Sequence, residues 1–175
     1  MEYRLLYLLP IVFIWMGCNE VHDESEMPIY EGPILELTNA TTYYSDSSVV
    51  RIKLQAPKQL EFENKDREFT EGIYIEFYGP DGTISTNLKA NYCYYYAKED
   101  KYRALGNVVV KDVAKGERVD TEELFWVPDD EIVYTNKFVR IETEGEIIMG
   151  EGLEAKQDFS WWTLEEMRGT IYLDE

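Results

Sequence analysis

The chain has 175 residues, of which 45% are hydrophobic and 14% aromatic, and its 17 Lys and Arg residues face 35 Asp and Glu residues for a net charge of −18. This length fits one domain plus a short export segment, and the hydrophobic content is sufficient for a core. The acidic balance argues against nucleic acid as a partner, because phosphate backbones select basic surfaces. We expect a solvated acidic surface.

The N-terminal residues 1–17 have the features of a lipoprotein signal peptide. The apolar run over residues 5–16 is shorter than the roughly 20 residues that a membrane-spanning helix needs. The pair Gly17-Cys18 ends the run and resembles a bacterial lipobox, so we expect acylation of Cys18. Trp15 stands where a lipobox usually has Leu, which leaves a short uncleaved membrane anchor as the alternative. Either interpretation places the domain outside the cytoplasm, on a membrane surface.

Residues 18–33 are acidic, contain two prolines and lack periodicity, which is typical of a flexible tether. The strand-like alternation begins after it and is clearest over residues 49–56, 72–79 and 84–96. Pro80-Asp81-Gly82 predicts a tight turn between the last two of these segments. Further turns are predicted at Lys115-Gly116, Asp129-Asp130 and Glu144-Gly145.

Residues 102–159 nearly repeat themselves with an offset of 29 residues. The offset aligns Asn107 with Asn136, Gly116 with Gly145, Val110 with Val139, and Leu124 with Leu153. Such a repeat of a two-strand unit predicts hairpins stacked side by side. Ten or more short strands at these turn spacings indicate an all-β, antiparallel domain over residues 34–160. In the remaining C-terminal tail, residues 161–175, the segment 162–169 favours a brief helix.

The sequence carries no pattern that indicates catalysis. It contains no phosphate-binding G-x-x-x-x-G-K, no H-E-x-x-H and no G-x-S-x-G motif. The single histidine, His22, lies in the tether, so Cys93 has no base to activate it and is expected to be a small buried side chain. Carboxylate doublets leave a glycosidase as a minor alternative. We therefore predict that the protein is not an enzyme and uses no cofactor or metal.

Several segments resemble the LptC family, the periplasmic component of lipopolysaccharide export, in its Bacteroidota-type lipoprotein form. They are YSDSSVVRIKLQAP, GIYIEFYGPDGTISTNLKANYCYYY, YRALGNVVV, TEELFW, FVRIET and IMGEGLEAKQDF. Their order and spacing, rather than any single motif, carry the resemblance from about residue 43 to residue 159. Many family members have an N-terminal transmembrane helix, whereas this chain is expected to use Cys18.

The resemblance implies a folded-over antiparallel sheet of the β-jellyroll or β-taco kind (OstA-like), open at both ends. It also implies a non-enzymatic subunit that receives lipopolysaccharide from an inner-membrane ABC transporter and holds the acyl chains between its strands. The expected partners are the ABC permease subunits and an LptA-like bridge protein, both joined through sheet edges. The expected location is the periplasmic face of the inner membrane, with a lipid anchor. The alternative is an envelope lipoprotein with a packed β-sandwich that acts as a binding or scaffold module.

Strand parity predicts which residues would line the acyl path. In the family's GNV motif, Gly106 and Asn107 are expected to shape a bend or a strand edge, or an ordinary bulge. The predicted lining residues are Ile52, Leu54, Ile73, Ile75, Phe77, Ala90, Tyr92, Val108, Val110, Leu124, Trp126, Val139, Ile141, Ile148 and Leu153.

Overall fold

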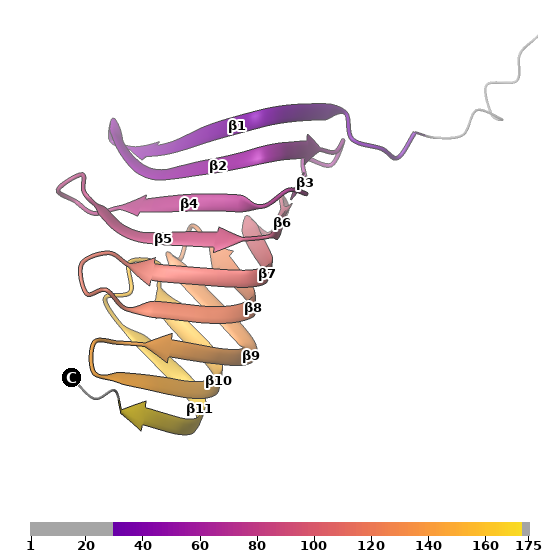
Figure 1. Cartoon of the computed structure of the whole chain (residues 1–175). Helices are drawn as coiled ribbons and strands as arrows, with labels where there is room; N and C mark the ends of the chain where they lie inside the picture. Colours follow the sequence, from indigo (N-terminus) through magenta and orange to yellow (C-terminus); the bar gives the residue numbers. More distant parts are fainter. Residues whose placement is uncertain (1–29, 173–175) are drawn as a thin grey trace, which may run out of the picture. The chain divides into compact units, whose positions relative to one another are not determined.

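A computed structural model describes residues 30–172 (Figure 1). The predicted signal peptide, Cys18 and most of the predicted tether lie outside the described residues. Every regular element within residues 30–172 is a β-strand, so the predicted all-β class is confirmed. A search of this part of the chain for helices with the length and apolarity of a membrane span finds none.

Eleven strands form a single antiparallel sheet. Their bounds are β1 Leu35–Asp46, β2 Val49–Glu61, β3 Arg67–Phe69, β4 Ile73–Tyr78, β5 Ile84–Ala90, β6 Tyr92–Tyr96, β7 Lys101–Asp112, β8 Arg118–Val127, β9 Ile132–Glu142, β10 Glu146–Lys156 and β11 Trp162–Tyr172. The order in the sheet follows the chain, because β3 and β4 lie end to end beside β2, and β5 and β6 lie end to end beside β7. The fold is thus a meander in which β3 with β4, and β5 with β6, each take the place of one interrupted strand.

A bend crosses the sheet and folds it into two layers. The first layer contains β4 and β5 with residues 108–112, 118–121, 139–142 and 146–150; the second contains β3 and β6 with residues 101–105, 124–127, 132–135 and 153–156. Where the layers meet, the pairing register shifts in the ladders β7–β8, β8–β9 and β9–β10. The front and rear layers of this folded sheet are visible in Figure 1.

Glycines allow the chain to turn at the bend. Gly72 between β3 and β4, Gly106 in β7 and Gly152 in β10 have φ angles of 99°, 72° and 69°, a range in which residues with a Cβ are strained. Each sits where a register shift or a break interrupts a strand. The bend therefore depends on glycines that are far apart in the sequence and that strand pairing aligns across the sheet.

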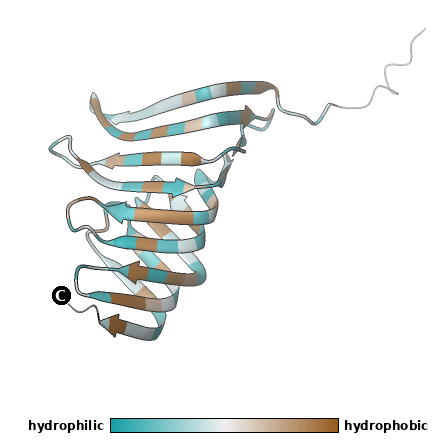
Figure 2. Ribbon diagram, viewed as in Figure 1, coloured by the Kyte–Doolittle hydropathy of each residue, from teal (hydrophilic) through white to brown (hydrophobic). Residues whose placement is uncertain are grey.

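Apolar and polar residues alternate along the strands (Figure 2), and the buried apolar side chains face the space between the layers. In β4, for example, Ile73, Ile75 and Phe77 are buried while Tyr74 and Glu76 are half-buried on the outer face. Period-2 alternation gives each layer one apolar face. Folding the sheet along the bend places these two apolar faces against each other in one core.

The predicted stacking of hairpins is confirmed. Hairpins β7–β8 and β9–β10 are adjacent through the β8–β9 ladder, and their turns contain Gly116 and Gly145 at the same margin of the first layer. All four turns predicted between residues 79 and 145 join consecutive strands.

The expectation for the C-terminus is wrong. Residues 162–169 do not form a helix: they belong to β11, which pairs with β10 from Trp162 to Tyr172. The sheet therefore extends beyond residue 160, where we expected the domain to end. An edge strand needs only one partner, and the backbone hydrogen bonds to β10 outweigh the helix propensity of the Leu-Glu-Glu-Met-Arg run.

Candidate functional site

The inner surface between the two layers gathers nearly all the residues predicted to line it. Fourteen of the fifteen are buried, with at most 8% of any of them exposed. Leu124, Trp126 and Leu153 come from the second layer, and the others come from the first. The fourteen buried residues are Ile52, Leu54, Ile73, Ile75, Phe77, Ala90, Val108, Val110, Leu124, Trp126, Val139, Ile141, Ile148 and Leu153.

The prediction for Tyr92 is wrong. The chain bends at Asn91, between β5 and β6, so that both Ala90 and Cys93 are buried and the parity of the following strand is reversed. Tyr92 is consequently half-buried on the outer face, where burial and the neighbouring Glu68 raise the pKa of its hydroxyl to about 12. Cys93 faces inward instead.

Gly106 and Asn107 form a bulge in β7. Both have left-handed backbone angles, with φ of 72° and 47°, and the β7–β8 register shifts between Leu105 and Val108. The Gly106 carbonyl accepts a hydrogen bond of 3.0 Å from the Asn91 N–H. The bulge thus lies on the bend line and ties β7 to the break between β5 and β6.

A row of aromatic rings crosses the inner surface. Phe77 of the first layer meets Trp126 of the second edge-on, with ring centroids 5.2 Å apart. Trp126 stacks on Tyr102 at 4.7 Å, and Tyr102 contacts Tyr95 at 4.6 Å. Aromatic contacts of this geometry add to the burial energy of the rings, so the row joins the layers firmly.

Hydrogen bonds satisfy the polar atoms of Tyr102 and Trp126 in this row. The hydroxyls of Tyr44 in β1 and Tyr102 in β7 share a hydrogen bond of 2.6 Å. The Trp126 indole Nε1–H donates to Oε1 of Gln157 at 2.9 Å. Since buried polar atoms are costly when unpaired, these partners allow Tyr and Trp to occupy a predominantly apolar surface.

The parity prediction did not include several inward residues. Phe69, Cys93, Tyr102, Ala104 and Phe159 are each at most 4% exposed. Tyr102 and Ala104 share the parity of Val108 in β7, so the same alternation could have identified them. Phe69 lies in a strand of three residues and Phe159 in a turn, where no periodicity exists to reveal them.

The margins of the two layers meet opposite the bend, along a line that we call the seam. Phe159, in the turn between β10 and β11, is 1% exposed. Its carbonyl oxygen accepts a hydrogen bond of 2.8 Å from Nζ of Lys115, in the turn between β7 and β8. Because these turns belong to different layers, the contact closes the seam at this point.

The Cys93 thiol lies on the inner surface and is buried. Burial raises the pKa of the Cys93 thiol well above its ordinary value, which keeps it protonated and unreactive. Within residues 30–172 there is no group of three or more His, Cys, Asp or Glu side chains that could hold a metal ion. The surface is suited to contact apolar groups.

A family model described as "Lipopolysaccharide-assembly, LptC-related" matches residues 11–172. The chain belongs to the LptC family. No protein among those with curated descriptions matches it. Family membership gives this LptC-family protein a role in lipopolysaccharide transport, and the family is a periplasmic component associated with the inner membrane.

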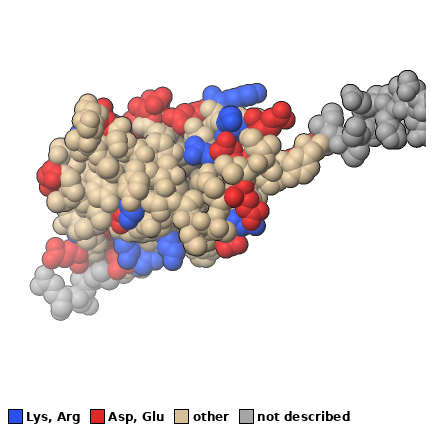
Figure 3. Space-filling model, turned by 90° about the horizontal axis from the view of Figure 1, so that it is seen from above, with Lys and Arg blue, Asp and Glu red and all other residues tan. Residues whose placement is uncertain are grey.

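Both ends of the sheet in this LptC-family protein present apolar edge strands. Within residues 30–172, β1 pairs only with β2, and β11 pairs only with β10. Leu35, Leu37 and Tyr43 are exposed on β1, and Met167 and Ile171 on β11. Seen from the β1 end, the visible surface is broadly uncharged, with charged groups at its margins (Figure 3). Exposed apolar edges of this kind are suited to strand addition by another protein.

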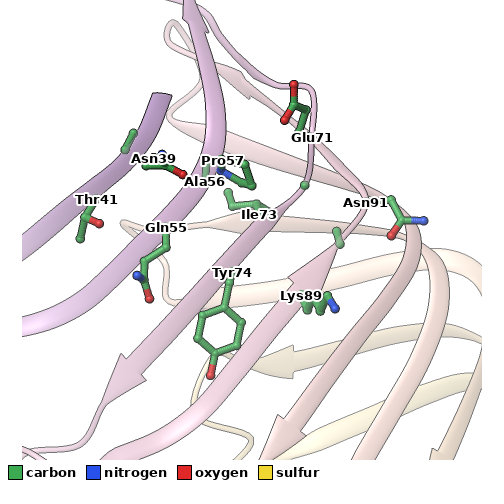
Figure 4. A pocket seen from close by; sticks show the side chains of 13 residues that line it. Asn39, Thr41, Gln55, Ala56, Pro57, Glu71, Ile73, Tyr74, Lys89 and Asn91 are labelled. Atoms are coloured by element: carbon green, nitrogen blue, oxygen red, sulfur yellow. The ribbon is translucent and has the colours of Figure 1, made fainter. Parts of the chain in front are cut away.

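A groove of about 720 Å³ lies at the bend, beside β1, β2, β4 and β5. The β2–β4 ladder ends at the pair Gln55 and Tyr74, and the groove opens beyond it (Figure 4). Ala56, Ile73 and Ala90, which are inward-facing core residues, form part of its wall. The groove therefore reaches side chains of the core from the outer face at this point.

Proposed function

We propose that this LptC-family protein is a non-enzymatic lipid-transfer subunit that holds the acyl chains of lipopolysaccharide between the two layers of its folded sheet. The single observation that carries the proposal is the inner surface. It is predominantly apolar, with a few buried threonines among the hydrophobic residues, it is built from both layers, and it runs between two edge strands that have no further partner among the described residues. Hydrocarbon chains need only such a surface, because the hydrophobic effect is non-directional.

The inward side chains already contact one another across the layers, so acyl chains must replace these contacts. Bound acyl chains keep the apolar surface of the protein covered. They are also removed from water themselves, which stabilises the complex by about 0.8 kcal/mol per buried CH₂. At the seam, the layers are joined by the buried Phe159 side chain and by the hydrogen bond from Lys115 to the Phe159 carbonyl. At the bend, by contrast, they are joined by continuous backbone. Separation of the layers is therefore expected at the seam.

We place the partners at the two edges. The tether, residues 18–33, ends two residues before β1, so the β1 edge faces the inner-membrane ABC permease subunits that supply the lipid. The β11 edge then passes the lipid to an LptA-like bridge protein. Acylation of Cys18 anchors the chain on the periplasmic face of the inner membrane, and ATP hydrolysis occurs in another subunit.

Photo-crosslinking in cells tests the inner surface. A photoreactive amino acid at Leu124 or Val139, which are buried on the inner surface, is expected to capture lipopolysaccharide. The neighbouring positions Phe125 and Arg140 point to the outer face and serve as matched controls. Equal capture at inner and outer positions would refute the assignment of the lipid path.

The packed interior favours a second candidate, an envelope lipoprotein that acts as a binding or scaffold module. The inward residues are closed to solvent, as in an ordinary sandwich core. Co-purification separates the candidates, because the scaffold function does not require an ABC permease. Recovery of the permease subunits together with inner-face crosslinks excludes the scaffold function.

A further inference from the structure

A second pocket lies at the open margin of the second layer, where the β2–β3 turn meets the β6–β7 turn. Its volume is about 510 Å³. The pairing of β3 with β6 brings these two turns together, although they are some 30 residues apart in the chain. The lining residues are Glu61, Asn64, Lys65, Arg67, Tyr95, Ala97 and Lys98.

The pocket is cationic on a strongly acidic chain. Lys65, Arg67 and Lys98 line it together with one carboxylate, Glu61. Lys65 lies 3.6 Å from Glu61, but its side chain is 70% exposed, so this ion pair contributes little. Lys98 forms no ion pair with any described residue. In a chain of net charge −18, such a cluster concentrates anions at one point of the surface.

Two other carboxylates stand near the pocket, and both already accept hydrogen bonds. Asp66 accepts from the Ala97 N–H at 2.8 Å and from the Tyr94 hydroxyl at 2.9 Å. Asp100 accepts from the Tyr95 hydroxyl at 2.8 Å. They fix the turns and the Tyr95 ring, and neither forms an ion pair with Arg67.

Arg67 is a partly buried cation whose described partners are aromatic and not carboxylates. Its side chain is half-buried on the inner side of β3, with the guanidinium carbon 4.2 Å from the centroid of the Tyr95 ring, and it interacts with the Tyr44 hydroxyl. No carboxylate of the described residues forms an ion pair with it. A guanidinium stays charged at every relevant pH, and partial burial without a counter-ion is unfavourable. The arrangement therefore favours an external anion.

The pocket adjoins the inner surface. Tyr95, which lies under Arg67, contacts Tyr102 at 4.6 Å, and Tyr102 stacks on Trp126. An anion bound at Arg67 would thus lie directly beside the row of aromatic rings on the inner surface. A ligand that uses both features has an anionic end and an apolar end.

We propose that this pocket binds a phosphate group of the transported lipid, while the apolar part of the lipid lies along the aromatic row. This inference rests on the proposed function and deepens it, because it makes the anionic headgroup part of what the protein recognises. A phosphate matches the site better than a carboxylate does. The guanidinium fork of Arg67 accommodates two phosphate oxygens, and Lys65 and Lys98 supply two further charges for a dianion.

Binding to two lipids that differ only in phosphate tests the proposal. The full chain, purified in detergent, is titrated with diphosphorylated lipid A and with the same lipid after enzymatic dephosphorylation. Arg67→Met keeps the apolar stem and removes the charge, and Arg51→Met on the outer face of β2 is the charge-matched control. We expect Arg67→Met to bind the phosphorylated lipid about 10-fold to 100-fold more weakly, with unchanged affinity for the dephosphorylated lipid. Arg51→Met should bind both lipids as the wild type does.

Two results would overturn the proposal: wild-type affinity of Arg67→Met for the phosphorylated lipid, or equal losses for both lipids. If thermal unfolding shows that Arg67→Met does not fold, Lys98→Met replaces it, since this exposed side chain has no ion-pair partner among the described residues. A weakening of about 3-fold confined to the phosphorylated lipid is then expected, and equal affinity overturns the proposal.

Titration with pyrophosphate tests anion binding at the pocket independently of lipid binding by the protein. If the wild type binds neither lipid, the proposed function fails. Saturable pyrophosphate binding that is lost in Arg67→Met would then support an anion site for a soluble phosphate. The absence of pyrophosphate binding in that case would overturn the pocket as well.

Discussion

Removing the Phe159 ring should destabilise the fold far more than its position in a turn suggests. The side chain is 1% exposed and belongs to the same core as the strands. Its turn also carries the carbonyl that Lys115 binds across the seam. Phe159→Ala leaves a cavity between the layers, and buried Phe→Ala substitutions cost about 3–5 kcal/mol.

Urea unfolding followed by tryptophan fluorescence measures this effect, because Trp126 lies in the core. With a slope of about 2 kcal/mol per molar urea, a loss of about 3–4 kcal/mol lowers the midpoint by about 1.5–2 M. Phe138→Ala is the matched control, since this phenylalanine is 48% exposed on β9 and its loss should cost about 1 kcal/mol or less. Equal midpoints for the two variants would refute the role of Phe159 in closing the seam.

Two further predictions concern the β11 edge and the acid stability. A Cβ at Gly150 would lie 2.5 Å from the Glu166 carbonyl oxygen of β11, so Gly150→Ala should detach β11, speed the hydrogen exchange of its amides and cost about 1–3 kcal/mol. Gly145→Ala, which meets open space, should leave β11 protected, and equal protection in both variants would contradict the prediction. Burial by itself raises the pKa of Asp66, but hydrogen bonds from the Ala97 N–H, the Tyr94 hydroxyl and Asn64 lower it below its ordinary value. A lowered folded-state pKa stabilises the protein above the unfolded-state value of about 4, and this stabilisation is lost as pH falls through the folded-state pKa. The melting temperature of the wild type should therefore exceed that of Asp66→Asn at about pH 6 and approach it at about pH 3, whereas a constant difference would show that Asp66 is not involved.

Strand parity in the amino-acid sequence is sufficient to identify most of the inner surface. Alternation is a property of the extended backbone itself, so a run such as residues 49–56 reveals its buried face without reference to its neighbours. Parity fails at Tyr92 because the bend at Asn91 reverses it there. The Asn91 N–H donates a hydrogen bond to the Gly106 carbonyl of β7. The position of such a distant strand cannot be read from the local alternation of residues.

The error at β11 has a related cause. Residues 162–169 favour a helix locally, yet their backbone groups complete the β10 ladder. Their state depends on pairing with the preceding strand and not on the segment alone, and the free edge of β10 decides it. The proposed phosphate pocket is also hidden from the sequence, because Arg67 of β3 and Lys98 of the β6–β7 turn are brought together only by the pairing of β3 and β6.

The amino-acid sequence alone determined the all-β class, the meander of hairpins and the apolar face of nearly every strand, because these follow from alternation and turn residues within short segments. Only the tertiary structure decided where the sheet bends, how the seam closes at Phe159 and which cations meet beside the aromatic row. These features depend on register between strands. Register is set by the combined packing of both layers, so no single segment of the chain contains it.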